Sequence, residues 1–443
     1  MENELFEKTP VEKAYIKLSL PLVLSMMVTM IYNLADTYFI AATGNTDLVA
    51  GVSLCAPVFT FLMAIGNIFG QGGTSLISRM LGQKNADGVK RVSSFCFYVA
   101  ILSGLVIGVL MLIFSGGLLK VLGADSATIA HASEYYTVLA IGAPFTVLSF
   151  IHSNLLRSEG RSKESMITSI SGAVFNIILD PILISYFGMG AMGAAVATII
   201  GYCSSVLFYL YIVRKRTQGL SLRISDCSVS AAELRQLFGI GGTAALSNLM
   251  QSAAVILVNQ YLLPYGNDRI AAMGVVMKIT MIATLIIVGF SFGGVPVFGY
   301  LYGARMKKEL NKLVRFTFGF LFFLAVMITL ILSVASPVVI GIFLKDSALI
   351  QAGSQMLRWQ LSGTVCIGIV QLLTVLFQAT GKVLPSFVLS ISRQGIVFLV
   401  VIVVCASLFG YQGVIMSQPA ADLISALIAV GLLIWQNPMK EGV

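Results

Sequence analysis

Charge is scarce in this sequence of 443 residues. Asp, Glu, Lys and Arg together make up 11% of the chain, whereas about 25% is usual for a soluble domain. Hydrophobic residues make up 57%, and the mean hydropathy is +0.93. No water-soluble fold of this size buries so much apolar surface, so we expect an all-α polytopic membrane protein.

Groups that support metal binding or covalent chemistry are also few. The chain has six cysteines and two histidines, with no CxxC pair and no metal-ligand spacing, so we expect reduced, structural cysteines. It lacks a GxxxxGK[ST] phosphate-binding loop, which excludes direct use of ATP. No nucleophile–base arrangement is evident, and we therefore expect neither an enzyme nor a resident cofactor.

Apolar stretches of about twenty residues, the length that a helix needs to cross a bilayer, recur along the whole chain. Lys and Arg concentrate in loops that would be cytoplasmic if the N-terminus is inside, as the positive-inside rule predicts. This distribution explains the net charge of +9 without a nucleic-acid partner, and it predicts cytoplasmic termini. The twelve expected helices lie near 15–42, 48–74, 92–115, 127–151, 165–187, 191–213, 238–262, 270–300, 314–337, 351–377, 384–407 and 413–435.

The two halves of the chain resemble each other. A shift of 221 residues aligns Asp47 with Asp268, Gly72–Gly73 with Gly293–Gly294, and Gly160 with Gly381. Each half holds six expected helices, an even number, so both repeats enter the membrane in the same orientation. Parallel repeats of this kind are typical of alternating-access transporters. We expect an N-lobe at 1–213, a cytosolic linker at 214–237 and a C-lobe at 238–443.

The symmetry fails at polar residues, which predicts a buried polar cluster in the N-lobe alone. Counted from the expected helix ends, Asp36, Tyr135, Asp180 and Thr198 lie about 10–12 Å inside the outer boundary of the membrane. Tyr32 and Asp36, like Asn176 and Asp180, are four residues apart and share a helix face. The unmatched pairs are Asp36 with Leu257, Tyr135 with Met356, Asn176 with Val397, Asp180 with Val401 and, at a shift of 220, Thr198 with Gln418.

Two carboxylates at one depth favour a coupling site. They cannot both ionise cheaply in an apolar medium, so a proton or a cation must join them. Pro181 lacks an N–H group and leaves the carbonyl of Ile177 without its helical donor, which adds an oxygen suited to H⁺ or Na⁺. The alternative is that Asp36 and Asp180 only pack helices together.

Four segments together resemble the multidrug and toxic compound extrusion (MATE) family, and most closely its bacterial DinF-like branch. They are SLPLVLSMM-x₅-YNLADTYFI, NLLRSEG at 154–160, NIILDPIL at 176–183 and SQPAADLIS at 417–425. The resemblance covers the whole chain and implies two parallel six-helix bundles of the MOP superfamily fold. It also implies export of cationic, aromatic drugs against a Na⁺ or H⁺ gradient.

The same resemblance implies roles for individual residues. Pro21 matches a proline associated with bending of the first helix. The NorM-like branch has acids in helices 7 and 10, which this sequence lacks, so coupling is expected in the N-lobe. Residues implicated in cation or proton binding are Tyr32, Asp36, Tyr135, Asn176, Asp180 and Thr198, of which Asp36, Asp180, Asn176 and Thr198 would hold Na⁺.

Weaker signals leave other roles open. Lys278 lies inside an expected helix and would take part in coupling, face water in the cavity or be paired for packing. Asn154 lies near the inner boundary, where a conformational or lid role is expected. Arg358 and Arg393 lie near helix ends and are expected to extend their charges toward the membrane surface.

The rival functions are a flippase for lipid-linked oligosaccharides and a non-transporting membrane scaffold. Acids in the centre favour small-molecule cationic cargo over a pyrophosphate. We expect a protein of the bacterial inner membrane, surrounded by the lipid bilayer, and nothing in the sequence requires more than a monomer.

Overall fold

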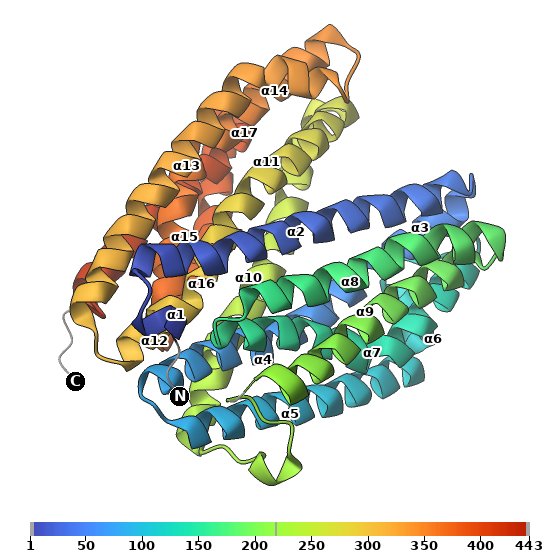
Figure 1. Ribbon diagram of the computed structural model, residues 1–443. Coiled ribbons are helices and arrows are strands. Elements are labelled where there is room, and N and C mark those ends of the chain that lie inside the picture. The colour runs from blue at the N-terminus through green and yellow to red at the C-terminus, as the bar shows by residue number, and fades with distance from the viewer. Residues whose placement is uncertain (1–3, 218, 440–443) are drawn as a thin grey trace. The chain divides into compact units, whose positions relative to one another are not determined.

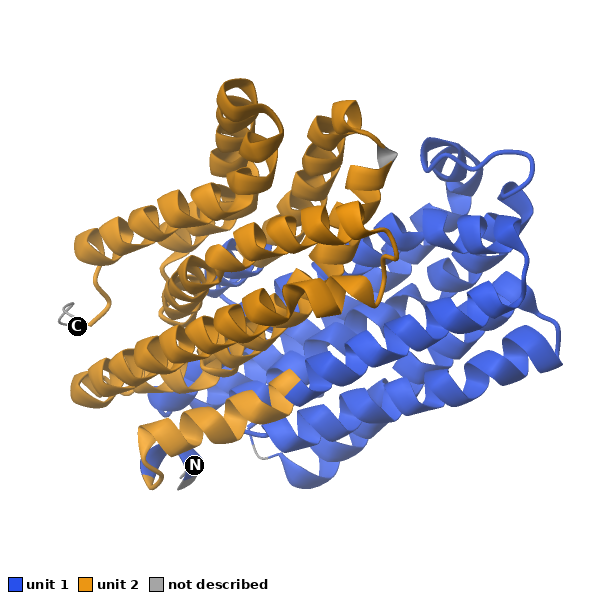
Figure 2. Ribbon diagram, turned by 90° about the horizontal axis from the view of Figure 1, so that it is seen from above, with its two compact units in different colours: residues 1–7, 24–242 blue, residues 8–23, 243–443 orange. Residues whose placement is uncertain are grey.

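The computed structural model describes residues 4–217 and 219–439, and every regular element in this part of the chain is helical. The chain divides into two compact units, shown in different colours in Figure 2. Unit 1 consists of residues 1–7 and 24–242, and unit 2 of residues 8–23 and 243–443. The compact units differ from the lobes expected at 1–213 and 238–443, because residues 8–23 belong to unit 2 and residues 238–242 belong to unit 1. Residues 1–3, 218 and 440–443 lie outside the described part.

Unit 1 is a bundle in which α7 is the central helix, in contact with α4, α5 and α9 (Figure 1). Glycines let the backbones approach, because a Cβ at Gly108 would lie 2.4 Å from the carbonyl oxygen of Ala140. Its elements are α1 (Glu4–Glu7), most of α2 (Val11–Ala42), α3 (Thr46–Leu54), α4 (Ala56–Gly82), α5 (Ala86–Ile113), α6 (Ser115–Val121), α7 (Ile129–Ser158), α8 (Ser162–Asp180), η1 (Pro181–Tyr186), α9 (Gly190–Arg216), η2 (Ile224–Asp226) and the first part of α10 (Ala231–Leu262).

Unit 2 has a core formed by the apolar faces of α11, α13, α14 and α17 and of the second part of α10, and α15 packs against α11, α13 and α17. Leu357, Leu361, Phe398 and Ile402 are fully buried there. The elements that follow α10 are η3 (Leu263–Tyr265), α11 (Asn267–Gly293), α12 (Val295–Gly303), α13 (Lys307–Gly341), α14 (Ser347–Ser362), α15 (Thr364–Ala379), α16 (Val383–Ile391), η4 (Ser392–Ile396) and α17 (Val397–Trp435).

The described residues contain eleven helical runs that are long and apolar enough to cross a membrane. The last run, Val383–Trp435, has 53 residues and contains two of the twelve expected helices. Gly410 divides it, with a φ of 54° and a ψ of −131°, a conformation that glycine adopts without strain. The eleven runs therefore correspond to the twelve helices predicted from the sequence.

Several expected helices are divided into two elements inside the membrane span. Cys55, Gly294 and Gly363 form three such junctions, and each keeps angles close to those of an α-helix. Pro57 and Pro296 follow the first two of these residues. Proline is well tolerated in the first turn of a helix, because the N–H groups of that turn have no partner within the helix and the N–H that proline lacks is not needed. The junction at Gly363 has no proline.

The units share α2, because its first part belongs to unit 2. The Tyr15 hydroxyl donates to the carbonyl oxygen of Phe290 at 2.9 Å, and Lys312 forms an ion pair with Glu12 at 2.9 Å. A Cβ at Gly293 would lie 2.4 Å from the Cα atom of Ser19, so this contact is between backbones.

The units share α10 in the same way, because residues 231–242 belong to unit 1. Arg91 pairs with Glu233 at 3.3 Å, and the rings of Phe69 and Phe238 meet edge to face at 5.6 Å. A Cβ at Gly72 would lie 2.3 Å from the carbonyl oxygen of Leu237. Gly72 aligns with Gly293 in the two repeats. Equivalent glycines therefore pack against the first part of α10 in unit 1 and against the first part of α2 in unit 2.

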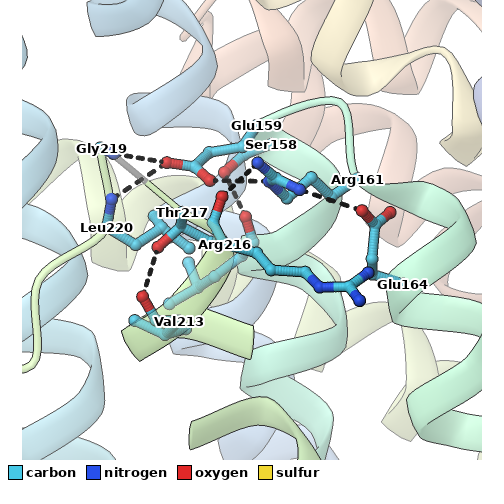
Figure 3. A network of polar contacts seen from close by, with 10 residues as sticks. Ser158, Glu159, Arg161, Glu164, Val213, Arg216, Thr217, Gly219 and Leu220 are labelled. Carbon is cyan, nitrogen blue, oxygen red and sulfur yellow. Dashed lines mark hydrogen bonds and ion pairs between the residues drawn. The ribbon is translucent and has the colours of Figure 1, made fainter. Parts of the chain in front are cut away.

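The segment between α9 and α10 is fastened to unit 1 by its backbone. The Ser94 hydroxyl donates to the carbonyl of Arg223 at 2.7 Å, and Tyr98 donates to that of Leu222 at 2.8 Å. Glu159 accepts from the N–H groups of Gly219 and Leu220, each at 3.0 Å, as Figure 3 shows. The described part of the expected linker is therefore a docked surface segment of unit 1.

Glu159 is expected to make the stability of this attachment depend on pH. Burial raises the pKa of Glu159, although Arg161 at 3.6 Å and the two N–H groups act in the opposite direction. A raised pKa means that the folded chain binds the proton more tightly than the unfolded chain. The free energy of unfolding should therefore fall as the pH rises from about 4.5, the ordinary glutamate value, through the raised pKa.

Glu159→Gln keeps an acceptor for both N–H groups and removes the titration. Thermal unfolding of the purified protein should then depend less on pH in the variant than in the wild type. Equal pH dependence in both proteins would show that Glu159 titrates alike in the folded and unfolded chains.

Candidate functional site: a buried acid pair in unit 1

Two carboxylates from different helices lie within electrostatic range of each other in unit 1. Asp180 is the last residue of α8 and is fully buried, and Asp36 lies on α2 and is half-buried. One carboxylate oxygen of Asp36, Oδ1, is buried without a hydrogen-bond partner among the described residues. A buried acceptor without a donor is costly, which favours a proton or a cation at this position.

Asn176 connects Asp180 with Thr198 of α9. Its side-chain nitrogen lies 3.4 Å from Oδ1 of Asp180 and 3.3 Å from the Thr198 hydroxyl. With the amide turned, its N–H donates to Oδ2 of Asp180 at 3.2 Å and its oxygen accepts from the Thr198 hydroxyl at 3.3 Å. This second orientation satisfies all three side chains, so Asn176 holds the carboxylate against α9.

Tyrosines surround the acids. Tyr135 of α7 lies within electrostatic range of both Asp36 and Asp180, and so does Tyr32 of α2. The Tyr32 hydroxyl lies 3.2 Å from the hydroxyl of Tyr202 on α9. All six residues implied by the family resemblance therefore belong to unit 1, and these contacts connect them in one cluster.

Tyr202 was missed in the sequence. It stacks on Phe59 at 6.1 Å with an interplanar angle of 17°, and its ring lies 6.1 Å from that of Phe150. The available signal was its position four residues after Thr198, which places both side chains on one face of α9. Aromatic rings and carboxylates are the groups to which organic cations are attracted.

For the cation export that the family resemblance implies, Tyr202→Phe is expected to lower the rate without unfolding the protein. The change keeps the ring on Phe59 and removes the hydroxyl that meets Tyr32. One neutral hydrogen bond contributes about 1 kcal/mol, so we expect a rate loss of about fivefold. Initial rates of dye efflux from liposomes and the melting temperature would be measured together. A rate equal to that of the wild type would remove Tyr202 from the site.

The backbone at Asp180 departs from an α-helix. Pro181 begins a π-helical segment, η1, at the C-terminal end of α8. Proline cannot donate to the carbonyl four residues before it, here that of Ile177, and π-helical segments often occur at functional positions.

Asn154 and Pro21 lie outside this cluster. Asn154 is 19 residues after Tyr135 on α7, about 28 Å along the helix. Its Nδ2 donates to the carbonyl of Phe150 at 2.6 Å, its Oδ1 accepts from Arg157, and its carbonyl accepts from Thr74 at 2.9 Å. Pro21 lies in the part of α2 that belongs to unit 2, three residues before the start of the unit 1 part.

Unit 2 also contains a buried charged cluster, so the prediction of buried polar groups in the N-lobe alone was wrong. Arg393 does not extend to the membrane surface as expected, because its Nε donates to Oδ1 of Asp422 at 2.8 Å. Arg358 meets the carbonyl of Ser333 and the hydroxyl of Ser336. Lys278 is exposed on α11.

Among the described residues no three His, Cys, Asp or Glu side chains are grouped as in a transition-metal site. The oxygens of Asp36, Asp180, Asn176 and Thr198 suit a hard monovalent cation or a proton.

A family model described as MatE matches residues 21–182 and 243–405, one region in each repeat and together more than half of the chain. The chain belongs to the MatE family. The first match includes Tyr32, Asp36, Tyr135, Asn176 and Asp180 and ends before Thr198 and Tyr202.

Relatives within the MatE family support this assignment over nearly the whole chain. The multidrug export protein MepA of Staphylococcus aureus (strain NCTC 8325 / PS 47) is 33% identical over 427 residues, which cover 96% of this chain and 94% of that protein. MepA of Staphylococcus haemolyticus (strain JCSC1435) is also 33% identical, with the same coverage.

A solved structure of an outward-facing multidrug resistance MATE family transporter of the MOP superfamily is also similar. It is 26% identical, with a TM-score of 0.90 over 98% of this chain and 96% of that one. The chain is therefore a multi-pass membrane protein with the fold of the MATE transporters.

Proposed function

We propose that the chain is a secondary active multidrug efflux antiporter of the bacterial inner membrane, with both termini in the cytoplasm. The observation that carries the proposal is the buried acid pair of unit 1, with one oxygen of Asp36 left without a partner. The relative named multidrug export protein MepA and the structure of a multidrug resistance transporter support it.

The coupling ion in this proposal is H⁺ or Na⁺. A proton would neutralise one carboxylate, whereas Na⁺ would be held by Asp36, Asp180, Asn176 and Thr198. Either ion removes the negative charge that attracts a cationic substrate, so ion and substrate compete for one site. Competition of this kind, combined with alternating access, produces antiport.

The proposed substrates are organic and mostly cationic, aromatic compounds. Tyr202, whose hydroxyl lies 3.2 Å from that of Tyr32, stacks on Phe59 and lies beside Phe150. Aromatic rings of this kind suit cation–π and stacking contacts. We propose that the transporter acts as a monomer in the lipid bilayer, binds no nucleic acid, needs no resident cofactor and catalyses no covalent reaction.

The test uses purified full-length protein in liposomes loaded with a fluorescent cationic dye. A pH gradient and a Na⁺ gradient are imposed separately. Uphill dye movement that one gradient drives, and that stops when this gradient is dissipated, would support antiport and identify the ion. No movement under either gradient would contradict the proposal, and transport of a lipid-linked oligosaccharide would then be measured.

A further inference from the structure

The ion pair between Arg393 and Asp422 in unit 2 leaves one of the two carboxylate oxygens of Asp422 without a hydrogen bond. Arg393 Nε and Gln418 Nε2 both donate to Oδ1 of Asp422, at 2.8 and 3.2 Å. The other oxygen, Oδ2, is buried and has no hydrogen-bond partner among the described residues, and the Asp422 side chain is 0% exposed. A purely structural ion pair is expected to satisfy both oxygens, because a buried unpaired acceptor destabilises the fold.

The free oxygen lies against Gly363, at the junction of α14 and α15 in the middle of the membrane span. A Cβ built on Gly363 would lie 2.8 Å from Oδ2 of Asp422. Gly363 separates α14 from α15 and is sixteen residues from each end of the span Ser347–Ala379. Gly363 keeps α-helical angles (φ −76°, ψ −10°), so the missing side chain at this position is what lets the carboxylate oxygen approach the backbone.

The two other helical segments at the pair are irregular. Arg393 belongs to the π-helical segment η4, in which Gly395 has non-helical angles (φ −112°, ψ −114°). Pro419 lies inside α17 and cannot donate to the carbonyl of Ile415. Asp422 therefore meets one π-helical segment, η4, and lies three residues after a proline inside its own helix. Segments of π-helix often occur at functional positions.

The titratable and charged groups around Asp422 are few. Arg393 faces it from η4, the Cys366 thiol lies within electrostatic range on α15, and Gln418 is the polar neighbour on its own helix. Asp422 and Arg393 neutralise each other, so a proton added to Oδ2 would leave Arg393 without a counter-ion.

We propose that Asp422 is a second proton-binding carboxylate of the transporter, held entirely within unit 2. A proton from water binds Oδ2 and forms an O–H bond, while Arg393 and Gln418 remain on Oδ1. The neutral acid holds the Arg393 guanidinium weakly, which favours a different arrangement of η4. The inference rests on the proposed antiport for its role in coupling, but proton binding itself can be measured without transport.

Infrared difference spectroscopy on the full-length protein tests proton binding directly. A change of pH should produce the C=O stretching band of a protonated carboxylic acid that is absent in Asp422→Asn. Asp268→Asn, which changes an exposed aspartate of unit 2, should retain the band. A spectrum unchanged by Asp422→Asn would overturn the proposal.

Asp422→Asn leaves Arg393 without a counter-ion, and this could unfold the protein. The double variant Arg393→Gln with Asp422→Asn keeps the site neutral and serves as the second test. We expect it to fold and to lose the infrared band together with most of its proton-driven dye efflux. Wild-type efflux with an unchanged pH profile in the double variant would show that the pair is structural only.

Failure of the proposed function gives a different result. If the wild type moves no dye under either gradient, the antiport proposal fails, while the infrared band still decides whether Asp422 binds a proton.

Discussion

Asp180→Asn is expected to abolish gradient-driven efflux while the protein still folds. Asparagine has nearly the same shape as aspartate and keeps an oxygen for the amide of Asn176, but it can neither bind a proton nor attract a cation. Without a carboxylate that takes up the ion, the gradient cannot drive the transport cycle. We therefore expect a rate loss of more than about 100-fold, equivalent to about 2.7 kcal/mol in activation free energy, which would leave only passive dye leakage.

The measurement compares initial efflux rates of wild type, Asp36→Asn and Asp180→Asn in liposomes containing equal amounts of protein. Asp268→Asn is the matched control, because this aspartate is exposed in unit 2 and outside the acid pair. Melting temperatures show whether the variants fold. Normal pumping by both Asp36→Asn and Asp180→Asn would mean that the acid pair only packs helices together.

Gly241→Ala is expected to destabilise the protein strongly. A Cβ at this position would lie 1.9 Å from the carbonyl oxygen of Ile68 on α4, a backbone atom that cannot move aside. The first part of α10 would have to leave unit 1 or shift along it. Overpacking typically costs about 1–3 kcal/mol, and a clash with backbone belongs at the upper end of that range. The expected result is a large fall in the melting temperature of the detergent-solubilised protein.

The neighbouring glycine provides the control. A Cβ at Gly242 would meet no atom within 4 Å. Alanine has a higher helix propensity than glycine by about 0.8–1 kcal/mol, so Gly242→Ala should leave stability unchanged or raise it. Equal melting temperatures for the two variants would contradict the close packing of α10 on α4.

Much of the fold follows from the length of the apolar stretches, because a bilayer accepts only helices of about twenty residues. The repeat shift then exposed Asp36 and Asp180 as residues without a counterpart, and the structure places both in one cluster of unit 1. The contacts among Asn176, Asp180 and Thr198 agree with the face predicted from the four-residue spacing.

The parts that could not be predicted depend on distant contacts. Arg393 and Asp422 are 29 residues apart on different helices, and helix periodicity carries no information about which faces meet. Tyr202 could not be recognised as a site residue from the sequence, because its contact with Tyr32 depends on how α2 packs against α9. The junction at Gly363 has no proline to indicate it. The division of α2 and α10 between the two units could not be predicted either, because each is one continuous helix across the boundary.

The exchange of helix parts bears on how such a chain could arise. Residues 8–23 belong to unit 2 and residues 231–242 to unit 1, so each repeat completes its unit with the start of the other repeat's first helix. A one-repeat ancestor with this exchange would have been a domain-swapped dimer, because neither copy alone contains a whole unit. Gene duplication and fusion would then have joined two already interlocked copies, and the docked segment between α9 and α10 is where that join lies.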